Sequence, residues 1–281
     1  MTATNLDEIL LNALNEDIGE GDHSSLAVIS PDASGKAVLI AKQAGMVAGL
    51  RVIKRLFELF DSRLQTDFHF ADGDMISPGN EIMHLRGPSL SILQTERLAL
   101  NIVQRMSGIA TVTLSYVKRL RGTNTKVLDT RKTTPNMRLL EKEAVRIGGG
   151  ENHRMGLYDM IMLKDNHIDF AGGIEKALIQ TRNYLRDNSM NLKVEIEVRD
   201  LNELKEVLKL GEVHRIMLDN FTPEETRVAI AMIDGKFQTE SSGGINLDTI
   251  RDYALAGVDY VSVGALTHQI FSLDLSLKAK I

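Results

Sequence analysis

Residues 193–219, KVEIEVRDLNELKEVLKLGEVHRIMLD, contain two short runs rich in valine, isoleucine, methionine and leucine on either side of a helical stretch. A strand, a helix and a further strand in this order predict two parallel strands joined by a right-handed crossover. The second run begins about 22 residues after the first, which is a compact spacing typical of a β/α barrel. This stretch therefore predicts a parallel β/α architecture for the chain around it.

The same alternation continues from Lys126 to the C-terminus. Six strands separated by helical stretches are predicted, and they are KVLDT, MIMLK, KVEIEV, RIMLD, FQTES and YVSVG. A closed barrel of eight units usually needs ~250 residues, and only about 155 are present from Lys126 onward. We therefore predict an incomplete β/α barrel of roughly six strands, with an open, doubly wound sheet as the alternative.

The first third of the chain has a different pattern. Between Gly35 and Leu85, the strand-like runs KAVLIAKQ, GMVAGL, LQTDFHF and EIMHLR are separated by glycine and proline, as in an antiparallel sheet. Helical patterns cover RVIKRLFELF and Leu90–Met106, and the second helix carries a polar stripe of Gln94, Arg97, Asn101 and Arg105. The two patterns meet near Gly108. We predict one domain at residues 1–108 and a barrel domain at 109–281, whose last helix packs back on the first domain.

The composition excludes several kinds of protein. The 281 residues carry 33 Lys+Arg against 38 Asp+Glu, a formal net charge of −5, so general affinity for nucleic acid is not expected. There is no cysteine, which excludes disulfides, thiolate metal sites and a cysteine nucleophile. The N-terminus lacks the basic segment of a signal peptide, and no apolar run approaches the ~20 residues that span a bilayer. We expect a cytoplasmic protein that does not contact membranes.

All six predicted barrel strands end in, or contain, polar or glycine-rich sequence. The segments are DTRKTT from Asp129, KDNH from Lys164, the pair Glu195 and Glu197, DN from Asp219, SSGG from Ser241 and GALTH from Gly264. Ligands bind at the carboxyl ends of strands in parallel architectures. These residues are therefore predicted to line one site.

The residue types at these strand ends indicate an anionic substrate that carries phosphate. The cationic residues are Arg131, Lys132, His153, Arg154, Lys164 and His268. Glu197 and Asp219 are hard oxygen ligands suited to Mg²⁺. The glycines of Ser242-Gly243-Gly244, ahead of a helix predicted to begin near Asn246, allow the backbone to approach a phosphate. The pattern alone predicts a magnesium-assisted transfer involving a phosphorylated, anionic substrate.

Less specific explanations apply to single residues. Asp219 is a candidate cap for the next helix, but Thr222-Pro223-Glu224-Glu225 already supplies a cap, an N1 proline and a capping-box glutamate. Glu195 and Glu197 are equally consistent with a barrel-lining pair, and Arg97 by default lies on a solvated helix face. The chain lacks the GxxxxGK[ST], HExxH and GxSxG motifs of other enzyme classes.

Seven stretches together run nearly from end to end of the chain and are specific enough to indicate a family. They are EDIGEGDHSS, TERLALNIVQRMSGIAT, DTRKTTPNMRLLEKEAVRIGGGENHRMGLYDMIMLKDNHI, EIEV, IMLDNF, ESSGGI and GVDYVSVGALTH. These stretches resemble quinolinate phosphoribosyltransferase, also called nicotinate-nucleotide pyrophosphorylase (carboxylating). The resemblance implies an N-terminal α/β sandwich followed by an open β/α barrel. It also implies that quinolinate and phosphoribosyl pyrophosphate are converted to nicotinate mononucleotide, pyrophosphate and CO₂ in NAD biosynthesis.

The resemblance implies roles for individual residues by their motif positions. The quinolinate pocket would contain Thr130, Arg131, His153, Arg154 and Lys164, with Arg97 from a neighbouring subunit. The catalytic residues would be Lys132, Lys164, Glu197 and Asp219, of which Glu197 and Asp219 would also bind Mg²⁺. The phosphate would be held by Ser242, Gly243, Gly244, Val263, Gly264, Ala265 and His268. The implied assembly is a homodimer with a shared active site, and further assembly is left open.

The sequence departs from the family pattern at three places, one of which is Ser24 in place of the usual threonine, and two alternative functions are left open. Asn136 stands where the family usually has glycine, and asparagine tolerates the left-handed backbone of such a turn. The interval from Glu197 to Asp219 is one residue longer than usual, which leaves the choice between Glu195 and Glu197 open. One alternative is a paralogous phosphoribosyltransferase-like protein associated with molybdenum transport, although KDNH from Lys164 matches the quinolinate enzymes better. The other is a non-catalytic anion-binding protein, which the two carboxylates disfavour.

Overall fold

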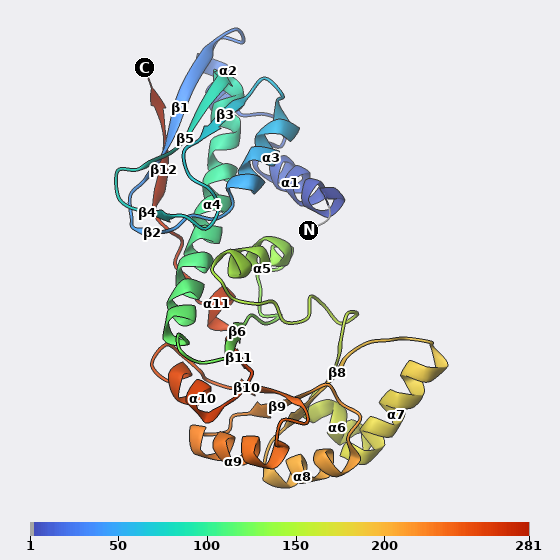
Figure 1. The fold of residues 1–281 in the computed structure, drawn as a ribbon. Helices are drawn as coiled ribbons and strands as arrows, with labels where there is room; N and C mark the ends of the chain where they lie inside the picture. The colour runs from blue at the N-terminus through green and yellow to red at the C-terminus, as the bar shows by residue number, and fades with distance from the viewer. Residues whose placement is uncertain (1–2, 281) are drawn as a thin grey trace. The chain divides into compact units, whose positions relative to one another are not determined.

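The computed structural model describes residues 3–280, with side chains from residue 6 onward (Figure 1). The chain divides into two compact units, and each has its own main sheet. The first unit contains the residues up to Leu114, Thr133–Gly149 and the residues from Leu266 onward. The second unit contains Ser115–Lys132 and Gly150–Ala265. Each unit is therefore assembled from separate stretches of the sequence.

An antiparallel sheet forms the centre of the first unit. Its strand order is β12-β1-β5-β3, with β1 at Ser34–Ala41, β3 at Gln65–Phe68, β5 at Glu81–Pro88 and β12 at Leu275–Lys280. A small separate sheet pairs β2 (Gly45–Met46) with β4 (Met75–Ile76). The antiparallel sheet predicted for this part of the chain is confirmed.

The C-terminal segment, for which the sequence analysis assigned no element, forms strand β12. It pairs with β1 along its whole length. Leu275, Leu277 and Ala279 alternate with Ser276 and two lysines, and this period of two is that of a strand rather than a helix. The segment does return to the first unit, but it does so as an edge strand of the sheet.

The helices of the first unit are α1 (Ala3–Ile18), α2 (His23–Val28), α3 (Leu50–Phe60), α4 (Ser89–Arg119, whose last turn lies in the second unit) and α5 (Arg138–Ile147). Leu39 and Met83 of the sheet meet Ile53 and Phe57 of α3 and Val103 of α4 around one small apolar gap. Burial of these side chains holds α3 and α4 against the sheet. Helix α4 has 31 residues and is thus about 46 Å long, so it continues well past its predicted end at Met106.

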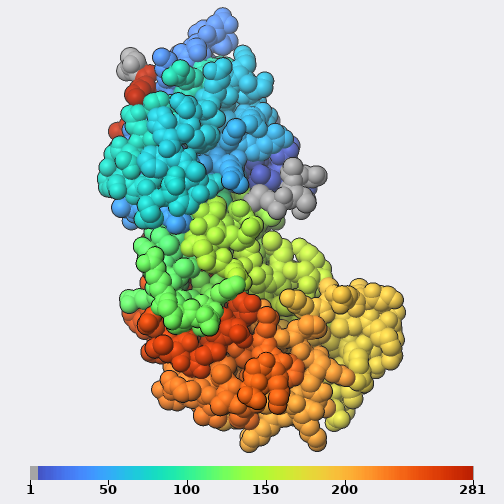
Figure 2. Space-filling model, in the orientation of Figure 1, coloured from blue at the N-terminus to red at the C-terminus, as the bar shows by residue number. Residues whose placement is uncertain are grey.

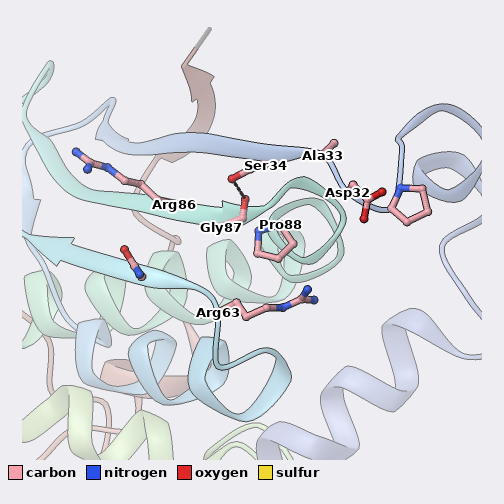
Figure 3. A pocket seen from close by; sticks show the side chains of 9 residues that line it. Asp32, Ala33, Ser34, Arg63, Arg86, Gly87 and Pro88 are labelled. Carbon is pink, nitrogen blue, oxygen red and sulfur yellow. Dashed lines mark hydrogen bonds between the residues drawn. The ribbon is translucent and has the colours of Figure 1, made fainter.

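A shallow pocket of about 400 Å³ opens at one end of the same sheet (Figure 3). Arg63 and Arg86 contribute positive charge to its lining. Arg63 is already paired with Asp61 at 2.8 Å, and Asp32 adds a carboxylate to the same lining. The remaining charge is too small to indicate an anion site here.

Gly108 lies in α4 where the segment before β12 passes close to the helix. A Cβ atom on Gly108 would overlap the backbone carbonyl of Phe271 and lie 3.2 Å from the Cα atom of Ser272. Replacing glycine by alanine within a helix normally stabilises it by ~1 kcal/mol. We expect Gly108→Ala to destabilise the protein instead, by about 1–3 kcal/mol, because backbone atoms must move. Denaturant unfolding measures this change, and increased stability would contradict the close approach.

A parallel sheet of six strands forms the second unit. The strands are β6 (Lys126–Leu128), β7 (Ile161–Leu163), β8 (Val194–Val198), β9 (Arg215–Asp219), β10 (Gln238–Ser242) and β11 (Tyr260–Ser262). Their order is β6-β11-β10-β9-β8-β7, and every pairing is parallel. All six predicted strands are confirmed.

The strand order decides between the two predicted architectures. From β7 to β11 each strand lies beside the next in sequence, and the last strand lies beside the first, β6. This circular order is that of a barrel, whereas a doubly wound sheet reverses direction at a switch point. Within residues 3–280, β6 and β7 share no ladder, so the barrel is open between them. The incomplete barrel is thus confirmed, and the doubly wound alternative is wrong.

The crossover helices are α6 (Asp165–Ala171), α7 (Ile174–Asp187), α8 (Leu201–Leu210), α9 (Pro223–Ile233), α10 (Ile250–Ala256) and α11 (Ala265–His268, at the boundary with the first unit). Figure 1 shows α8, α9 and α10 along the outer side of the sheet, and Figure 2 shows their side chains covering that side. Leu204 and Val207 of α8 and Ala229 of α9 are fully buried there. Among the described residues, no helix has the length and apolar character needed to cross a membrane.

Candidate active site

The carboxyl ends of the barrel strands carry most of the predicted site residues. Lys164 follows β7, Glu197 lies in β8 and Asp219 is the last residue of β9. The other predicted groups at strand ends of this unit are Thr130–Lys132 after β6, Ser242–Gly244 at the end of β10 and Val263–Ala265 after β11. All of these residues belong to the second unit. Parallel strands therefore bring them to one edge of the sheet.

Lys164, Glu197 and Asp219 form the charged centre of this edge. The Lys164 Nζ atom lies 2.8 Å from Oε2 of Glu197, whose side chain is 7% exposed against 43% for Lys164. Burial raises the pKa of Asp219, and the Glu197 carboxylate raises it further, while Lys164 lowers it. Two carboxylates near one ammonium group leave an excess of negative charge. A further cation would offset this excess.

The donor atoms of this group fit Mg²⁺. Glu197 and Asp219 offer the carboxylate oxygens that this ion prefers. Asp219 is not used as a helix cap, because Thr222 and Glu225 form the capping box of α9 as the sequence predicted. Glu195, the other candidate, lies two residues earlier on the same face of β8, is fully buried and contacts His153 inside the barrel. The geometry supports Glu197 over Glu195 as the partner of Asp219.

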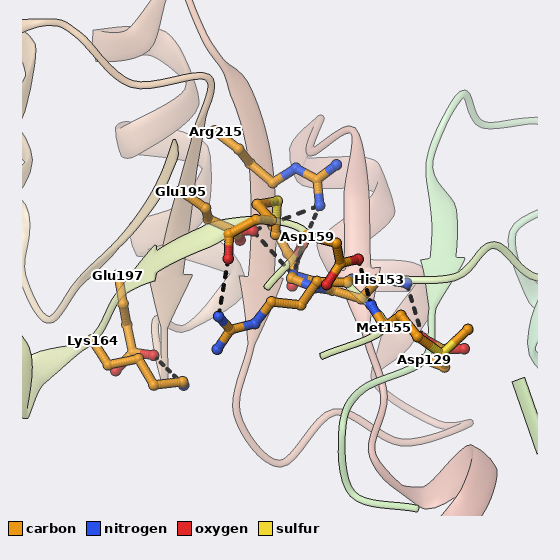
Figure 4. Close-up of polar contacts among 11 residues, drawn as sticks. Asp129, His153, Met155, Asp159, Lys164, Glu195, Glu197 and Arg215 are labelled. Atoms are coloured by element: carbon orange, nitrogen blue, oxygen red, sulfur yellow. Dashed lines mark hydrogen bonds and ion pairs between the residues drawn. The ribbon is translucent and has the colours of Figure 1, made fainter. Parts of the chain in front are cut away.

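A cluster of charged residues lies inside the barrel (Figure 4). This buried ion cluster consists of Glu195 from β8, Arg215 from β9, Glu240 from β10 and His153 from the loop before β7. The Nε2 atom of His153 lies 3.0 Å from Oε2 of Glu195 and 3.5 Å from Oε2 of Glu240. Nη1 of Arg215 lies 2.8 Å from Oε2 of Glu240. Sequence reasoning missed Arg215 and Glu240, whose one signal is a charged residue at a strand position that faces the barrel interior.

Burial governs the protonation of the two carboxyl groups in this cluster. It raises the pKa of Glu240 to about 7, with a further rise from Glu195, against the opposing effects of His153 and Arg215. Burial also raises the pKa of Glu195 to about 7, against the opposing charges of Arg215 and Arg154. Near neutral pH the pair therefore carries less than two full negative charges.

The turn after β10 brings two strand ends close together. Gly243 and Gly244 have φ values of +103° and +60°, which favour glycine. A Cβ atom on Gly243 would overlap the Asn220 side chain and lie 2.9 Å from the Asn220 backbone nitrogen. The corresponding position at Gly244 has no heavy atom within 4 Å. Gly243 therefore permits close packing on the residue after β9, and the backbone at Gly244 is accessible to a ligand.

The helix after this turn begins later than predicted. It was expected near Asn246, but α10 begins at Ile250. Oδ1 of Asn246 accepts the backbone N–H groups of Asp248 at 2.9 Å and Thr249 at 3.2 Å, so a turn precedes the helix. A phosphate bound here would contact the backbone of the glycine turn rather than the N-terminus of α10.

The remaining cationic residues of the barrel lie in loops. Arg131 and Lys132 are exposed after β6, where the backbone N–H of Lys132 donates to Oγ1 of Thr130 at 3.1 Å. In the same loop Asn136 has φ of +63°, which confirms that asparagine adopts the left-handed backbone at the position of the usual glycine. Arg154 is half-buried, and its Nη1 donates to the carbonyl of Met160 at 3.2 Å.

Two predicted site residues, Arg97 and His268, lie in the first unit, and both are exposed. Arg97 is on α4 in the predicted polar stripe. Another member of that stripe, Arg105, is held by Glu141 at 2.7 Å and donates to the carbonyl of Thr267 at 2.9 Å. The stripe is therefore not a uniformly solvated face. The roles expected for Arg97 and His268 stay predictions.

The open β/α barrel carries cations, two carboxylates and a glycine turn at its strand ends. This arrangement defines a protein that binds anionic, phosphorylated ligands. Comparison with known families makes this assignment specific. Family models described as the N-terminal and C-terminal domains of quinolinate phosphoribosyl transferase match residues 22–107 and 109–278. The chain belongs to the quinolinate phosphoribosyltransferase family.

Individual relatives agree with this family over nearly the whole chain. The chain is 42% identical to the probable nicotinate-nucleotide pyrophosphorylase [carboxylating] of Bacillus subtilis, with 99% of this chain and 94% of the relative covered. It is 41% identical to a mitochondrial quinolinate phosphoribosyltransferase [decarboxylating] of Nicotiana glauca, with 97% and 82% covered. The crystal structure of NadC from Streptococcus pyogenes matches with a TM-score of 0.93 and 44% identity, covering 99% of this chain and 97% of that one.

The raised pKa of Glu240 predicts how stability depends on pH. Because this pKa is about 7 in the folded protein against an ordinary value of 4.5, folding takes up protons between these values. The contribution of Glu240 is therefore fully present below pH 4.5 and is lost as pH rises through 7, with a slope of up to ~1.4 kcal/mol per pH unit. We expect Glu240→Gln to flatten the profile of melting temperature against pH in this range. Parallel profiles for both proteins would contradict the assignment.

Proposed function

We propose that this chain catalyses the decarboxylating transfer of phosphoribose to quinolinate. Quinolinate and phosphoribosyl pyrophosphate would yield nicotinate mononucleotide, pyrophosphate and CO₂, a step of NAD biosynthesis. The observation that carries the proposal is the group of Lys164, Glu197 and Asp219 at the strand ends of a barrel from this family. The names of the relatives support it, and they give no support to a molybdenum-associated paralogue.

Quinolinate carries two carboxylates, so its pocket requires several cations. Arg131, Arg154 and Lys164 would supply them, since guanidinium groups bind carboxylates through two parallel hydrogen bonds. His153 was also expected in this pocket. Its side chain is 6% exposed and lies against Glu195 and Glu240. We therefore propose that His153 contributes to the pocket through the loop that it anchors.

Departure of pyrophosphate leaves cationic character on the ribose. In our proposal the carboxylates of Glu197 and Asp219 lie near that charge, and Lys132 stabilises the leaving group. Mg²⁺ held by Glu197 and Asp219 would supply a second positive charge for the leaving pyrophosphate. The glycine turn at Ser242–Gly244, with Val263–Ala265 and His268, would hold the 5′-phosphate.

Loss of CO₂ follows from the attachment of the ring. The quinolinate nitrogen becomes cationic when it bonds to the ribose carbon. The electron pair of the breaking bond to the 2-carboxylate then stays on the ring carbon beside this nitrogen, which stabilises it. That carbon takes up one proton to give nicotinate mononucleotide. The reaction needs no oxidant and no organic cofactor.

Product analysis tests the activity and its substrate specificity. We expect nicotinate mononucleotide and CO₂ in equal amounts from quinolinate, phosphoribosyl pyrophosphate and Mg²⁺, with little product when Mg²⁺ is removed by a chelator. Nicotinate should be a poor substrate, because a pocket built for two carboxylates leaves a cation unpaired. Comparable turnover of nicotinate and quinolinate would overturn the assignment.

Lys164 can be tested against a matched lysine of the same unit. We expect Lys164→Ala to lower kcat/KM by about two orders of magnitude, as for the loss of one charged contact in the transition state. The melting temperature should change little, because the pair with Glu197 is partly exposed. Lys126→Ala is the control, since Lys126 forms an exposed ion pair with Glu151 at the first residue of β6. A lower melting temperature with near-normal activity would make Lys164 a structural residue.

We propose that the active protein is a homodimer in which Arg97 of one subunit completes the quinolinate pocket of the other. Arg97 is exposed on α4, as such a role requires. In a two-fold dimer each site would combine Lys164 of one chain with Arg97 of its partner.

Mixing two inactive variants tests the shared site. Arg97→Ala and Lys164→Ala homodimers should each be nearly inactive, because every site lacks one cation. If subunits exchange at random, half of the dimers are mixed, and about a quarter of all sites have both residues. We expect activity to recover toward a quarter of the wild-type level. A mixture with proven subunit exchange that stays inactive would exclude the shared site.

We also propose a cytoplasmic location. The chain lacks a helix that could cross a membrane within its described residues, and it has a bacterial relative of similar length. The plant relatives are named as mitochondrial or chloroplastic, so the location is a proposal independent of the activity.

A further inference from the structure

The loop at residues 152–160 carries Arg154 and has no helix or strand of its own. Its first residues are tied to Asp129 at the end of β6: Oδ2 accepts from the Asn152 side chain, and Oδ1 accepts from the His153 backbone N–H at 2.9 Å. Further along, the carboxylate of Asp159 accepts the backbone N–H groups of Met155 and Gly156. An irregular loop that must hold a guanidinium group in place depends on such anchors.

His153 anchors the loop from inside the barrel. Its Nδ1 atom accepts the backbone N–H of Arg154 at 2.7 Å, so Nδ1 carries no proton and the ring proton is on Nε2. Nε2 lies 3.0 Å from Glu195 and 3.5 Å from Glu240. The two carboxylates thus favour the tautomer that allows the contact between the ring and the Arg154 backbone.

Arg215, at the amino end of β9, is the fourth member of the buried ion cluster. Its guanidinium lies 2.8 Å from Glu240 and 3.9 Å from Glu195, and it stacks at 4.1 Å over the ring of Tyr260. This charge offsets part of the negative charge that the two glutamates place in the barrel interior. Arg215 is the first residue of β9, and Asp219 is its last. The two are about 13 Å apart along the strand, so Arg215 is far from the proposed reaction centre.

We propose that Glu240 and Arg215 are positioning residues for the quinolinate pocket: they hold His153 in one place and one tautomer, and His153 holds the loop that presents Arg154. The inference rests on the proposed function, which puts Arg154 at a quinolinate carboxylate. In the proposed function, phosphoribosyl pyrophosphate contacts the strand ends and the glycine turn rather than this loop. Disturbing the buried ion cluster should therefore weaken the binding of quinolinate and leave the binding of phosphoribosyl pyrophosphate unchanged.

Glu240→Gln is the first test, because glutamine keeps the size of the side chain and removes its charge. We expect the KM for quinolinate to rise about tenfold, because a displaced Arg154 guanidinium loses part of its charged hydrogen bonding to the substrate carboxylate. The KM for phosphoribosyl pyrophosphate should stay within about twofold of the wild-type value. Glu212→Gln is the matched control, because Glu212 forms an exposed ion pair with Arg182 at 2.7 Å outside the barrel. It should change neither KM.

Two further variants separate positioning from general stability. Glu240→Asp retains the charge and should recover part of the affinity for quinolinate. Arg215→Lys retains the charge but loses the planar fork and its stacking on Tyr260, and it should give a smaller rise in the same KM. Arg215→Lys also serves as the test if Glu240→Gln does not fold. Equal changes in both KM values, or a lower melting temperature alone, would overturn the proposal.

Hydrogen–deuterium exchange gives a readout that does not depend on activity. In Glu240→Gln we expect faster exchange of the backbone amides of residues 152–156, with no change at β8 and β10. Unchanged exchange in this loop would overturn the proposal. If the wild-type protein fails to turn over quinolinate, the proposed function is wrong, and the exchange data still decide whether the cluster anchors the loop.

Discussion

The contact between His153 and the two buried glutamates is the interaction on which the active-site edge depends. Barrel interiors are usually filled by branched aliphatic side chains. Here Glu195, Glu240 and Arg215 occupy part of the interior and receive the imidazole of a loop residue. Buried charges are tolerated only when they are paired, so these four groups hold one another in place. The loop above them, which has no helix or strand of its own, can then hold the half-buried Arg154 in place.

Most of the fold could be predicted because its patterns are local. The six barrel strands are short segments separated by helical stretches, with the last four spaced at about 22 residues, and each was found. The C-terminal strand LSLKAK was not predicted, because a strand at the edge of a distant sheet has only six residues and one partner, β1. The start of α10 was placed too early, because the Asn246 side chain satisfies two backbone N–H groups in a turn.

The site was predictable to the extent that it follows from strand ends. Lys164, Glu197 and Asp219 lie at or beside the carboxyl ends of neighbouring parallel strands, so the architecture alone brings them together. Arg215 and Glu240 could not be found in this way, because their partners are on other strands and their pairing depends on register. Their signal in the sequence is a charged residue at a strand position that faces the interior. Glu195 and Glu197 share one face of β8, where Glu195 lies against His153 and Glu197, two residues nearer the carboxyl end of the strand, lies beside Lys164.

The most direct test of this account is a crystal structure of the protein with quinolinate bound. The account predicts that the quinolinate carboxylates contact Arg154, Arg131 and Lys164, while the His153 ring stays against Glu195 and Glu240 as in the free protein. A structure in which His153 leaves the two glutamates to contact quinolinate, or in which quinolinate binds away from the strand ends, would contradict it.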